Sequence, residues 1–216
     1  MMKTGLLFDL DGTLLDTLED LLDATNYALR THGFPEKSLE QLRKVVGNGA
    51  ANQIRKSLPE GTDEEIVQQV LATYKPYYSA HSQIKTKPYE GIPEVIRQLT
   101  GKYPMAIVSN KPDNAVKDLS GFWFPGIYAL GENADCPRKP AADMVYKAMA
   151  AIGVEKCIYI GDSEVDILTA RNAGVPCLSV TWGFRDLDVL QQAGGDHFCS
   201  SVAEFVSTVE EMIHGK

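Results

Sequence analysis

Residues 5–17 have the sequence GLLFDLDGTLLDT, an apolar run that ends in two carboxylates, Asp9 and Asp11, followed by a glycine turn. Side chains two residues apart on a strand point the same way, so the two acids are predicted to lie side by side and repel each other. An unpaired buried carboxylate is costly, which favours a bound cation, and Mg²⁺ suits such oxygen ligands. From this stretch alone, the alternative to a metal site is an ordinary polar turn at the end of a strand, and it stays open.

The composition restricts the class of protein. The chain has 216 residues, enough for one α/β domain with a smaller second module, and its net charge of −8 argues against nucleic acid as a partner. Its four cysteines show no metal-binding spacing and are expected to be reduced. No apolar stretch approaches the ~18 residues that span a membrane, and no signal peptide is recognisable. We therefore expect a cytoplasmic protein, and both a monomer and a homodimer stay open.

Strand-like and helix-like segments alternate in the second part of the chain. Strands are predicted at residues 105–109, 127–129, 157–161 and 175–180, and helices at 92–100, after Pro112, and at 140–152, 164–172 and 202–213. This alternation favours a doubly wound, Rossmann-like α/β core, in which helices cover both faces of a parallel sheet.

The segment 16–87 follows a different pattern, because it contains no strand-like run. An amphipathic helix is predicted from residue 18, and the capping-box spacings at 38–41 and 62–65 predict the start of two more. We therefore predict a core domain of residues 1–15 and 88–216, with an all-helical domain of residues 16–87 inserted in it.

Further polar side chains follow the predicted strands of the core. Ser109 and Asn110 end one strand, and Lys139 stands before a predicted helix. Asp162 and Asp166 are four residues apart where a strand becomes a helix, so they are expected on one side of its first turn. The carboxyl ends of parallel strands form one edge of the sheet, so these residues should converge with Asp9 and Asp11 there.

The motif Asp9-Leu10-Asp11-Gly12-Thr13 resembles the first motif of the haloacid dehalogenase superfamily, most of whose members are phosphatases. The longer string through Thr17 resembles the phosphoglycolate phosphatase group within it. The other polar positions match the remaining motifs of the superfamily, and the inserted helical domain matches its cap. The second aspartate, Asp11, disfavours the dehalogenase branch, which lacks it.

The resemblance implies a role for each residue of the core motifs. Asp9 is expected to attack phosphorus and form an aspartyl-phosphate, while Asp11 acts as general acid and then as general base. Thr13, Ser109 and Lys139 are expected to hold phosphoryl oxygens. Relatives often carry a second proline where this chain has Ala142, which leaves open whether Arg138 shares the role of Lys139.

The resemblance also implies a Mg²⁺ site. Asp9, the backbone carbonyl of Asp11, and Asp162 are its expected ligands, and Asp166 is expected to act indirectly or through water. Substrate contacts are expected from Asn110 and from the cap residues Arg43, Gly47, Asn48 and Gly49, although the glycines there also fit a simple turn between helices. Arg55 stays open as an alternative to Arg43 for the cap cation.

The substrate is expected to be a small phosphorylated metabolite. A compound like 2-phosphoglycolate is the first choice, and pyrophosphate or a sugar phosphate is the alternative. Leu21 stands where related sugar-phosphate mutases, such as phosphoglucomutases, have a cap histidine, which favours a hydrolase. A non-enzymatic interaction module would require all of these acids to be vestigial.

Overall fold

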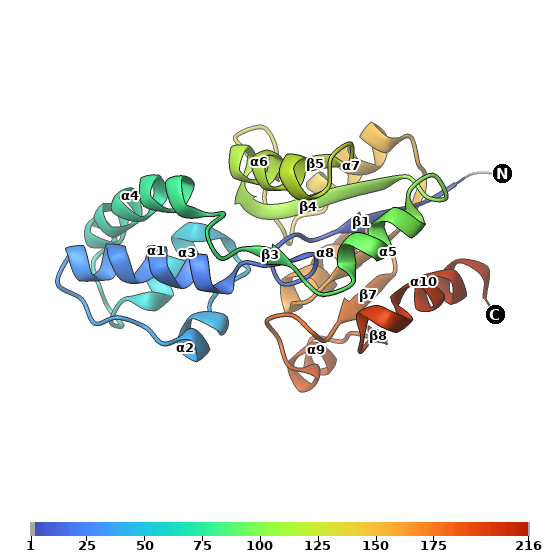
Figure 1. Cartoon of the computed structure of the whole chain (residues 1–216). Coiled ribbons are helices and arrows are strands. Elements are labelled where there is room, and N and C mark those ends of the chain that lie inside the picture. Colours follow the sequence, from blue (N-terminus) through green and yellow to red (C-terminus); the bar gives the residue numbers. More distant parts are fainter. Residues whose placement is uncertain (1–2, 216) are drawn as a thin grey trace. The chain divides into compact units, whose positions relative to one another are not determined.

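The computed structural model describes residues 3–215 and divides them into two compact units (Figure 1). One unit contains the residues up to Leu15 and those from Pro88 onward, and the other is Asp16–Lys87. The chain crosses between them at two short strands that pair with each other, β2 (Leu15–Asp16) and β3 (Lys87–Pro88). None of the described helices is long and apolar enough to cross a membrane.

The larger unit is built on a six-stranded sheet within the described residues, in the order β5-β4-β1-β6-β7-β8, and all its pairings are parallel. The strands are β1 (Thr4–Phe8), β4 (Met105–Pro112), β5 (Tyr128–Glu132), β6 (Lys156–Gly161), β7 (Cys177–Val180) and β8 (His197–Cys199). The helices are α5 (Ile92–Leu99), α6 (Asp113–Trp123), α7 (Asp143–Ile152), α8 (Glu164–Ala173), α9 (Leu187–Gln192), the 3₁₀ helix η1 (Val202–Glu204) and α10 (Phe205–His214).

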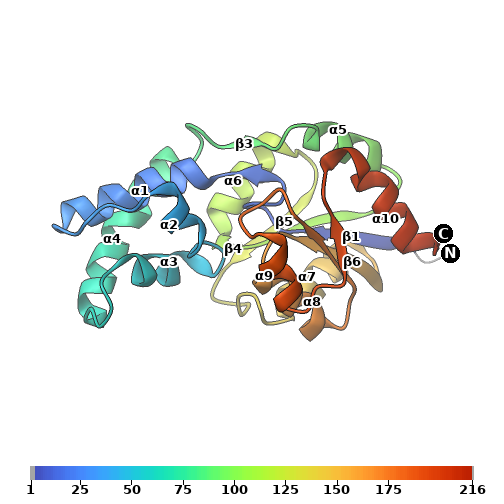
Figure 2. The same cartoon turned by 90° about the horizontal axis from the view of Figure 1, so that it is seen from below.

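The strand β1 shows why the sheet needs helices on both faces. Its side chains alternate, so that Leu6 and Phe8 enter one apolar cluster and Leu7 enters another. The first cluster is completed by α5, α6 and α10, and the second by α7, α8 and α9. Figure 2 shows α5 and α10 on one side of the sheet and α7, α8 and α9 on the other. The predicted doubly wound α/β class is therefore confirmed.

The unit Asp16–Lys87, all of which the structure describes, contains four helices: α1 (Leu18–Thr31), α2 (Leu39–Arg43), α3 (Gly49–Ser57) and α4 (Glu64–His81). The capping box predicted at Ser38 is confirmed, because its hydroxyl accepts the Gln41 N–H while the Gln41 side chain accepts the Ser38 N–H. The one predicted at Thr62 is wrong. Its hydroxyl donates to the Pro59 carbonyl (2.6 Å), and the helix begins after Asp63.

Three elements were not predicted, and the start of a fourth was predicted too early. The prediction missed α3, whose short sequence has few apolar residues, and it missed α9 and β8, which are too short to show a period. The helix expected from residue 140 begins only at Asp143, because a turn precedes it in which the Ala141 N–H donates to the Arg138 carbonyl (3.1 Å).

Candidate active site

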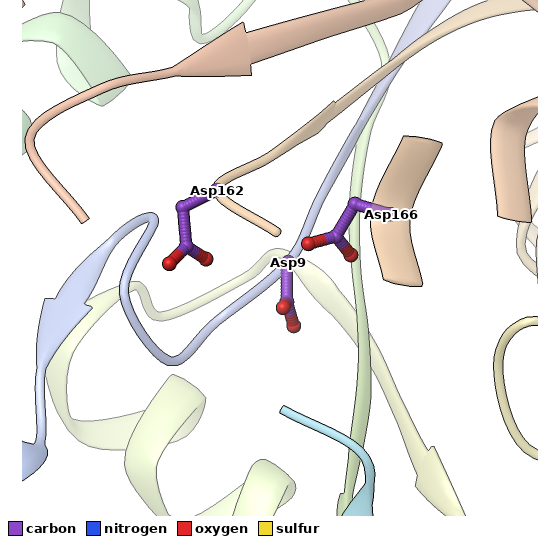
Figure 3. A group of neighbouring side chains, drawn as sticks. All are labelled: Asp9, Asp162 and Asp166. Carbon is purple, nitrogen blue, oxygen red and sulfur yellow. The ribbon is translucent and has the colours of Figure 1, made fainter. Parts of the chain in front are cut away.

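Three buried carboxylates meet at the carboxyl edge of the sheet. Asp9 follows β1, Asp162 follows β6, and Asp166 lies in the first turn of α8 (Figure 3). One oxygen from each lies within 4.8 Å of the others. The parallel pairing of β1 with β6 sets this convergence, since the Asp9 N–H donates to the Ile160 carbonyl (2.8 Å) and so continues the ladder beyond the strand.

A buried lysine neutralises part of this charge. The ammonium Nζ of Lys139 lies 3.0 Å from Oδ1 of Asp9 and 2.8 Å from Oδ1 of Asp166, and its side chain is only 1% exposed. Arg138 points elsewhere, with its guanidinium 3.8 Å from Glu132 and its side chain 39% exposed. Lys139, and not Arg138, therefore makes ion pairs with the carboxylates, whereas contact of either residue with a phosphoryl group stays a prediction.

Asn110 fixes the backbone of this lysine. Its side-chain oxygen accepts the Lys139 N–H (2.8 Å), and its amide nitrogen donates to the Lys139 carbonyl (3.0 Å). The neighbouring Ser109 is 2% exposed, and its hydroxyl accepts the N–H of Lys111 (3.3 Å). The end of β4 thus carries one side chain that positions a cation and one hydroxyl at the same edge. Phosphoryl contact by Ser109 and substrate contact by Asn110 stay predictions.

Asp162 is held by groups from two loops. Its oxygens accept the Phe184 N–H (2.7 Å) and the Thr13 hydroxyl (3.1 Å). Glycines let both loops approach, because a Cβ on Gly12 would lie 2.3 Å from an Asp162 oxygen and one on Gly183 would lie 2.4 Å from the Asp162 Cβ. The φ of +81° at Gly12 also favours glycine there. The contact of the Gly183–Phe184 segment with Asp162 was not predicted from the sequence. The one indication of it there is an isolated glycine after a strand.

The two carboxylate oxygens of Asp166 have different partners. Its Oδ2 accepts the backbone N–H (3.1 Å) and the hydroxyl (2.6 Å) of Ser163, which closes a capping box at the start of α8. Its Oδ1 receives the ammonium of Lys139. Both oxygens therefore have partners within the protein, and the expected indirect role of Asp166 at a metal stays a prediction.

The pKa values follow from burial at this cluster. Burial raises the pKa of Asp9 well above its ordinary value, against the attraction of Lys139 and with support from the neighbouring acids. Burial and the nearby Asp166 raise the pKa of Asp162 to about 7, although the Phe184 N–H opposes the shift. Burial lowers the pKa of Lys139, but the attraction of Asp166 and Asp9 outweighs it and holds that pKa well above its usual range.

The cluster fits a hard divalent cation. Among the described residues, Asp9, Asp162 and Asp166 form the group of carboxylates close enough to hold one. The donors are all oxygens, and the buried lysine balances only part of their charge. Burial, together with the neighbouring acids, raises the pKa of Asp9 and of Asp162, so a cation bound between them would stabilise their ionised forms. Oxygen donors with uncompensated negative charge are what Mg²⁺ requires.

The carboxylate of Asp11 lies outside this group and has a different cation. Nζ of Lys111, from the end of β4, is 2.6 Å from Oδ1 of Asp11, and the lysine side chain is 4% exposed. The two aspartates of the first motif therefore pair with different lysines, because β1 ends at Phe8 and strand alternation does not continue beyond it. They still repel each other, since the charge of Asp11 helps to raise the pKa of Asp9. The sequence analysis also missed Lys111. Its one signal was its place two residues after Ser109, where strand alternation puts both side chains on one side.

The residues predicted for the cap lie around the start of α3. Arg43 ends α2, Gly47 and Asn48 form the connection, and Gly49 begins α3. Both glycines have positive φ, +114° at Gly47 and +76° at Gly49, which explains them as turn residues. They belong to the unit Asp16–Lys87, and their role as substrate contacts stays a prediction.

Comparison with known proteins identifies the family. A model described as haloacid dehalogenase-like hydrolase matches residues 6–180, which is most of the chain. The chain belongs to the haloacid dehalogenase-like hydrolases. The match includes Asp9, Asp11, Ser109, Lys139 and Asp162, so every motif on which the resemblance rested lies inside it.

Individual relatives refine this assignment. "Phosphoglycolate phosphatase 1" of Pseudomonas aeruginosa is 33% identical over 190 residues, covering 83% of this chain and 70% of the relative. The phosphoglycolate phosphatase of Rhodobacter capsulatus is 33% identical over 214 residues, covering 95% and 97%. A solved structure from Lactobacillus delbrueckii subsp. bulgaricus, provisionally described as a phosphoglycolate phosphatase, superposes with a TM-score of 0.91 at 36% identity over the full length of both chains. This haloacid dehalogenase-like hydrolase is therefore a phosphatase that acts on phosphate monoesters.

Proposed function

We propose that this phosphatase hydrolyses a small, anionic phosphate monoester such as 2-phosphoglycolate, in a Mg²⁺-dependent reaction through an aspartyl-phosphate on Asp9. The observation that carries the proposal is the pair of acids Asp9 and Asp11 at one sheet edge, each with its own buried lysine. Mg²⁺ would be held by Asp9, Asp162 and the backbone carbonyl of Asp11. When bound, it supplies positive charge that lowers the repulsion between the attacking carboxylate and the phosphate.

In the first step, an oxygen of Asp9 attacks phosphorus while the bond from phosphorus to the leaving oxygen breaks. Asp11 gives its proton to that oxygen, so the alcohol leaves in neutral form. Lys139 keeps the carboxylate of Asp9 in place through its 3.0 Å ion pair, and its charge also attracts the phosphoryl oxygens. Ser109, at the same edge, supplies a hydroxyl donor, and Thr13 would supply a second once its hydroxyl turns away from Asp162.

In the second step, water attacks the phosphorus of the aspartyl-phosphate. Asp11, now ionised, takes a proton from this water, the bond between phosphorus and Asp9 breaks, and inorganic phosphate leaves. The proton that Asp11 gave to the alcohol is thereby replaced, and both aspartates return to their starting states. The reaction consumes one ester and one water and yields one alcohol and one phosphate.

The substrate assignment rests on the names of the relatives and on the motif of the first loop. Two relatives at 33% identity are phosphoglycolate phosphatases, one of them aligned over 95% of this chain. A leaving group that carries a carboxylate needs a cation beyond those that face the phosphate, and Arg43 is the residue we propose for it. Pyrophosphate and sugar phosphates are the alternatives that the same catalytic residues allow.

The decisive test is phosphate release from a panel of phosphorylated metabolites, with Mg²⁺ or with EDTA, by the unchanged protein and by Asp9→Asn. We expect Mg²⁺-dependent release with 2-phosphoglycolate among the best substrates, and a loss of about a thousandfold or more in kcat for Asp9→Asn, equal to about 4 kcal/mol or more. Asp118→Asn, on the exposed face of α6, is the control and should keep full activity. Full activity in EDTA, or a smaller loss for Asp9→Asn, would contradict the proposal.

A further inference from the structure

We propose that Lys111 is a positioning residue, whose buried ammonium holds the carboxyl group of Asp11 where it can protonate the leaving group. The inference rests on the proposed function, in which Asp11 is the general acid. It assigns a task to Lys111, whose ammonium pairs with Asp11.

The first support is the contact itself. Nζ of Lys111 lies 2.6 Å from Oδ1 of Asp11, and the two side chains are only 4% and 14% exposed. A charge-assisted hydrogen bond in a site with so little water is strong and directional. It joins residues 100 positions apart in the sequence. The parallel pairing of β1 with β4 makes this possible, because the loop that follows β1 then lies beside the end of β4.

The second support is the local shape of β4. Its register with β5 shifts between Val108 and Pro112, so the strand is irregular where Lys111 lies. Such irregularities redirect side chains and are common next to active sites. The backbone N–H of Lys111 also donates to the Ser109 hydroxyl (3.3 Å), which limits the freedom of this turn. A flexible lysine side chain is thereby fixed at its base by the chain and at its tip by Asp11.

The third support is the division of the two lysines between the two acids. Lys139 reaches Asp9 at 3.0 Å and Asp166 at 2.8 Å, whereas Lys111 reaches Asp11. Asp9 must face the phosphorus atom, and Asp11 must face the leaving oxygen on its far side. Two carboxylates of one short loop would otherwise turn toward the same cation, since each is attracted to any nearby positive charge. Separate cations keep them in separate orientations.

This positioning role predicts an effect that depends on the leaving group. Phenyl phosphate and p-nitrophenyl phosphate have similar size and the same charge, but phenolate is the poorer leaving group and needs the proton more. We expect Lys111→Met to slow the first step with phenyl phosphate by about 30-fold or more, and with p-nitrophenyl phosphate by less than about threefold, because general acids contribute about 10²–10⁴-fold to rates. Asp11→Asn should show the same pattern. Lys111→Arg keeps the cation and should restore the ratio of the two rates, phenyl phosphate to p-nitrophenyl phosphate, to that of the unchanged protein.

The experiment measures phenol or p-nitrophenol release in a single turnover, with enzyme in excess over substrate and Mg²⁺ present. Lys117→Met is the matched control, since Lys117 also pairs with an aspartate, Asp113 at 2.6 Å, but on the exposed side of α6. Melting temperatures show whether each variant is folded. If Lys111→Met is not folded, Lys111→Gln takes its place, and its selective loss with phenyl phosphate should have the same direction but be smaller, because its amide can still donate to Asp11.

The outcomes separate this inference from the proposed function. Equal losses with both esters, or a rise in KM with an unchanged ratio of the two rates, would overturn the positioning role while the phosphatase proposal stands. If the unchanged protein releases no phosphate in Mg²⁺ from either ester or from 2-phosphoglycolate, the proposed function fails and this inference fails with it. A selective loss for phenyl phosphate that Lys111→Arg reverses is the result that supports it.

Discussion

Replacing Asp162 by asparagine is expected to stabilise the metal-free protein at high pH. Asp162 is 1% exposed, and burial together with Asp166 raises its pKa from 3.8 to about 7. Between these two values the folded state keeps a proton that the unfolded chain has lost. The free energy of unfolding therefore falls as the pH rises from about 4 to about 7, because the folded protein must then ionise a buried carboxyl group.

The size of the effect follows from the two pKa values. One pKa unit corresponds to about 1.4 kcal/mol, so the full penalty approaches about 4 kcal/mol above pH 7. Part of it is already present at pH 5, which leaves about 3 kcal/mol between pH 5 and pH 8. Asparagine has a similar shape, cannot ionise, and keeps an oxygen that can accept the Phe184 N–H. The variant should lose this pH dependence, so its advantage over the unchanged protein should grow by about 3 kcal/mol, or roughly 6–12 °C in Tm.

The assay is urea denaturation followed by circular dichroism in EDTA at pH 5 and pH 8, with Asp118→Asn as a surface control. Saturating Mg²⁺ at pH 8 should remove most of the stability advantage of Asp162→Asn. A hundredfold excess over Kd stabilises the unchanged protein by about 2.7 kcal/mol, whereas Asp162→Asn should gain little. The contrary outcome is that the two proteins show the same change in free energy of unfolding between pH 5 and pH 8 in EDTA. In that case the cluster does not hold Asp162 in its protonated form, and the argument for uncompensated charge at this site fails.

Two further substitutions test the predicted roles of the core lysine Lys139 and of the cap arginine Arg43. Lys139→Met leaves two buried carboxylates without their ammonium and should lower the free energy of unfolding by about 3–5 kcal/mol in chemical denaturation, whereas the neighbouring, half-exposed Arg138→Met should change it by less than about 0.5 kcal/mol. Similar losses for both would contradict the assignment of Lys139. Arg43→Ala should raise KM for 2-phosphoglycolate about tenfold or more, in line with about 1.5–3 kcal/mol for a charged hydrogen bond, but hardly affect p-nitrophenyl phosphate, which has no second anion. Arg55→Ala is the control, since Arg55 already pairs with Glu64 (2.8 Å) on the surface. If Arg43→Ala changes KM equally for both substrates, Arg43 does not bind the carboxylate of the substrate.

The sequence by itself determined the features that depend on neighbouring residues. The apolar run before Asp9, the helix start after Ser163 and the capping box at Ser38 are local patterns, and the structure contains all three. The fold class also followed from local patterns, because apolar strands that alternate with helices bury both faces of a sheet in a restricted number of ways. The family followed from motifs whose order along the chain is itself part of the sequence.

Only the tertiary structure decided which charged groups meet. The pairing of Lys111 with Asp11 joins residues 100 positions apart, and the choice of Lys139 over Arg138 depends on a turn that Asn110 holds in place. Helix α3 was missed for a similar reason, since its buried Gln53 donates to the Thr25 hydroxyl (2.9 Å) of α1 rather than following an apolar period. Such contacts depend on strand register and side-chain direction, which arise from the packing of distant segments and leave no repeating pattern in the sequence.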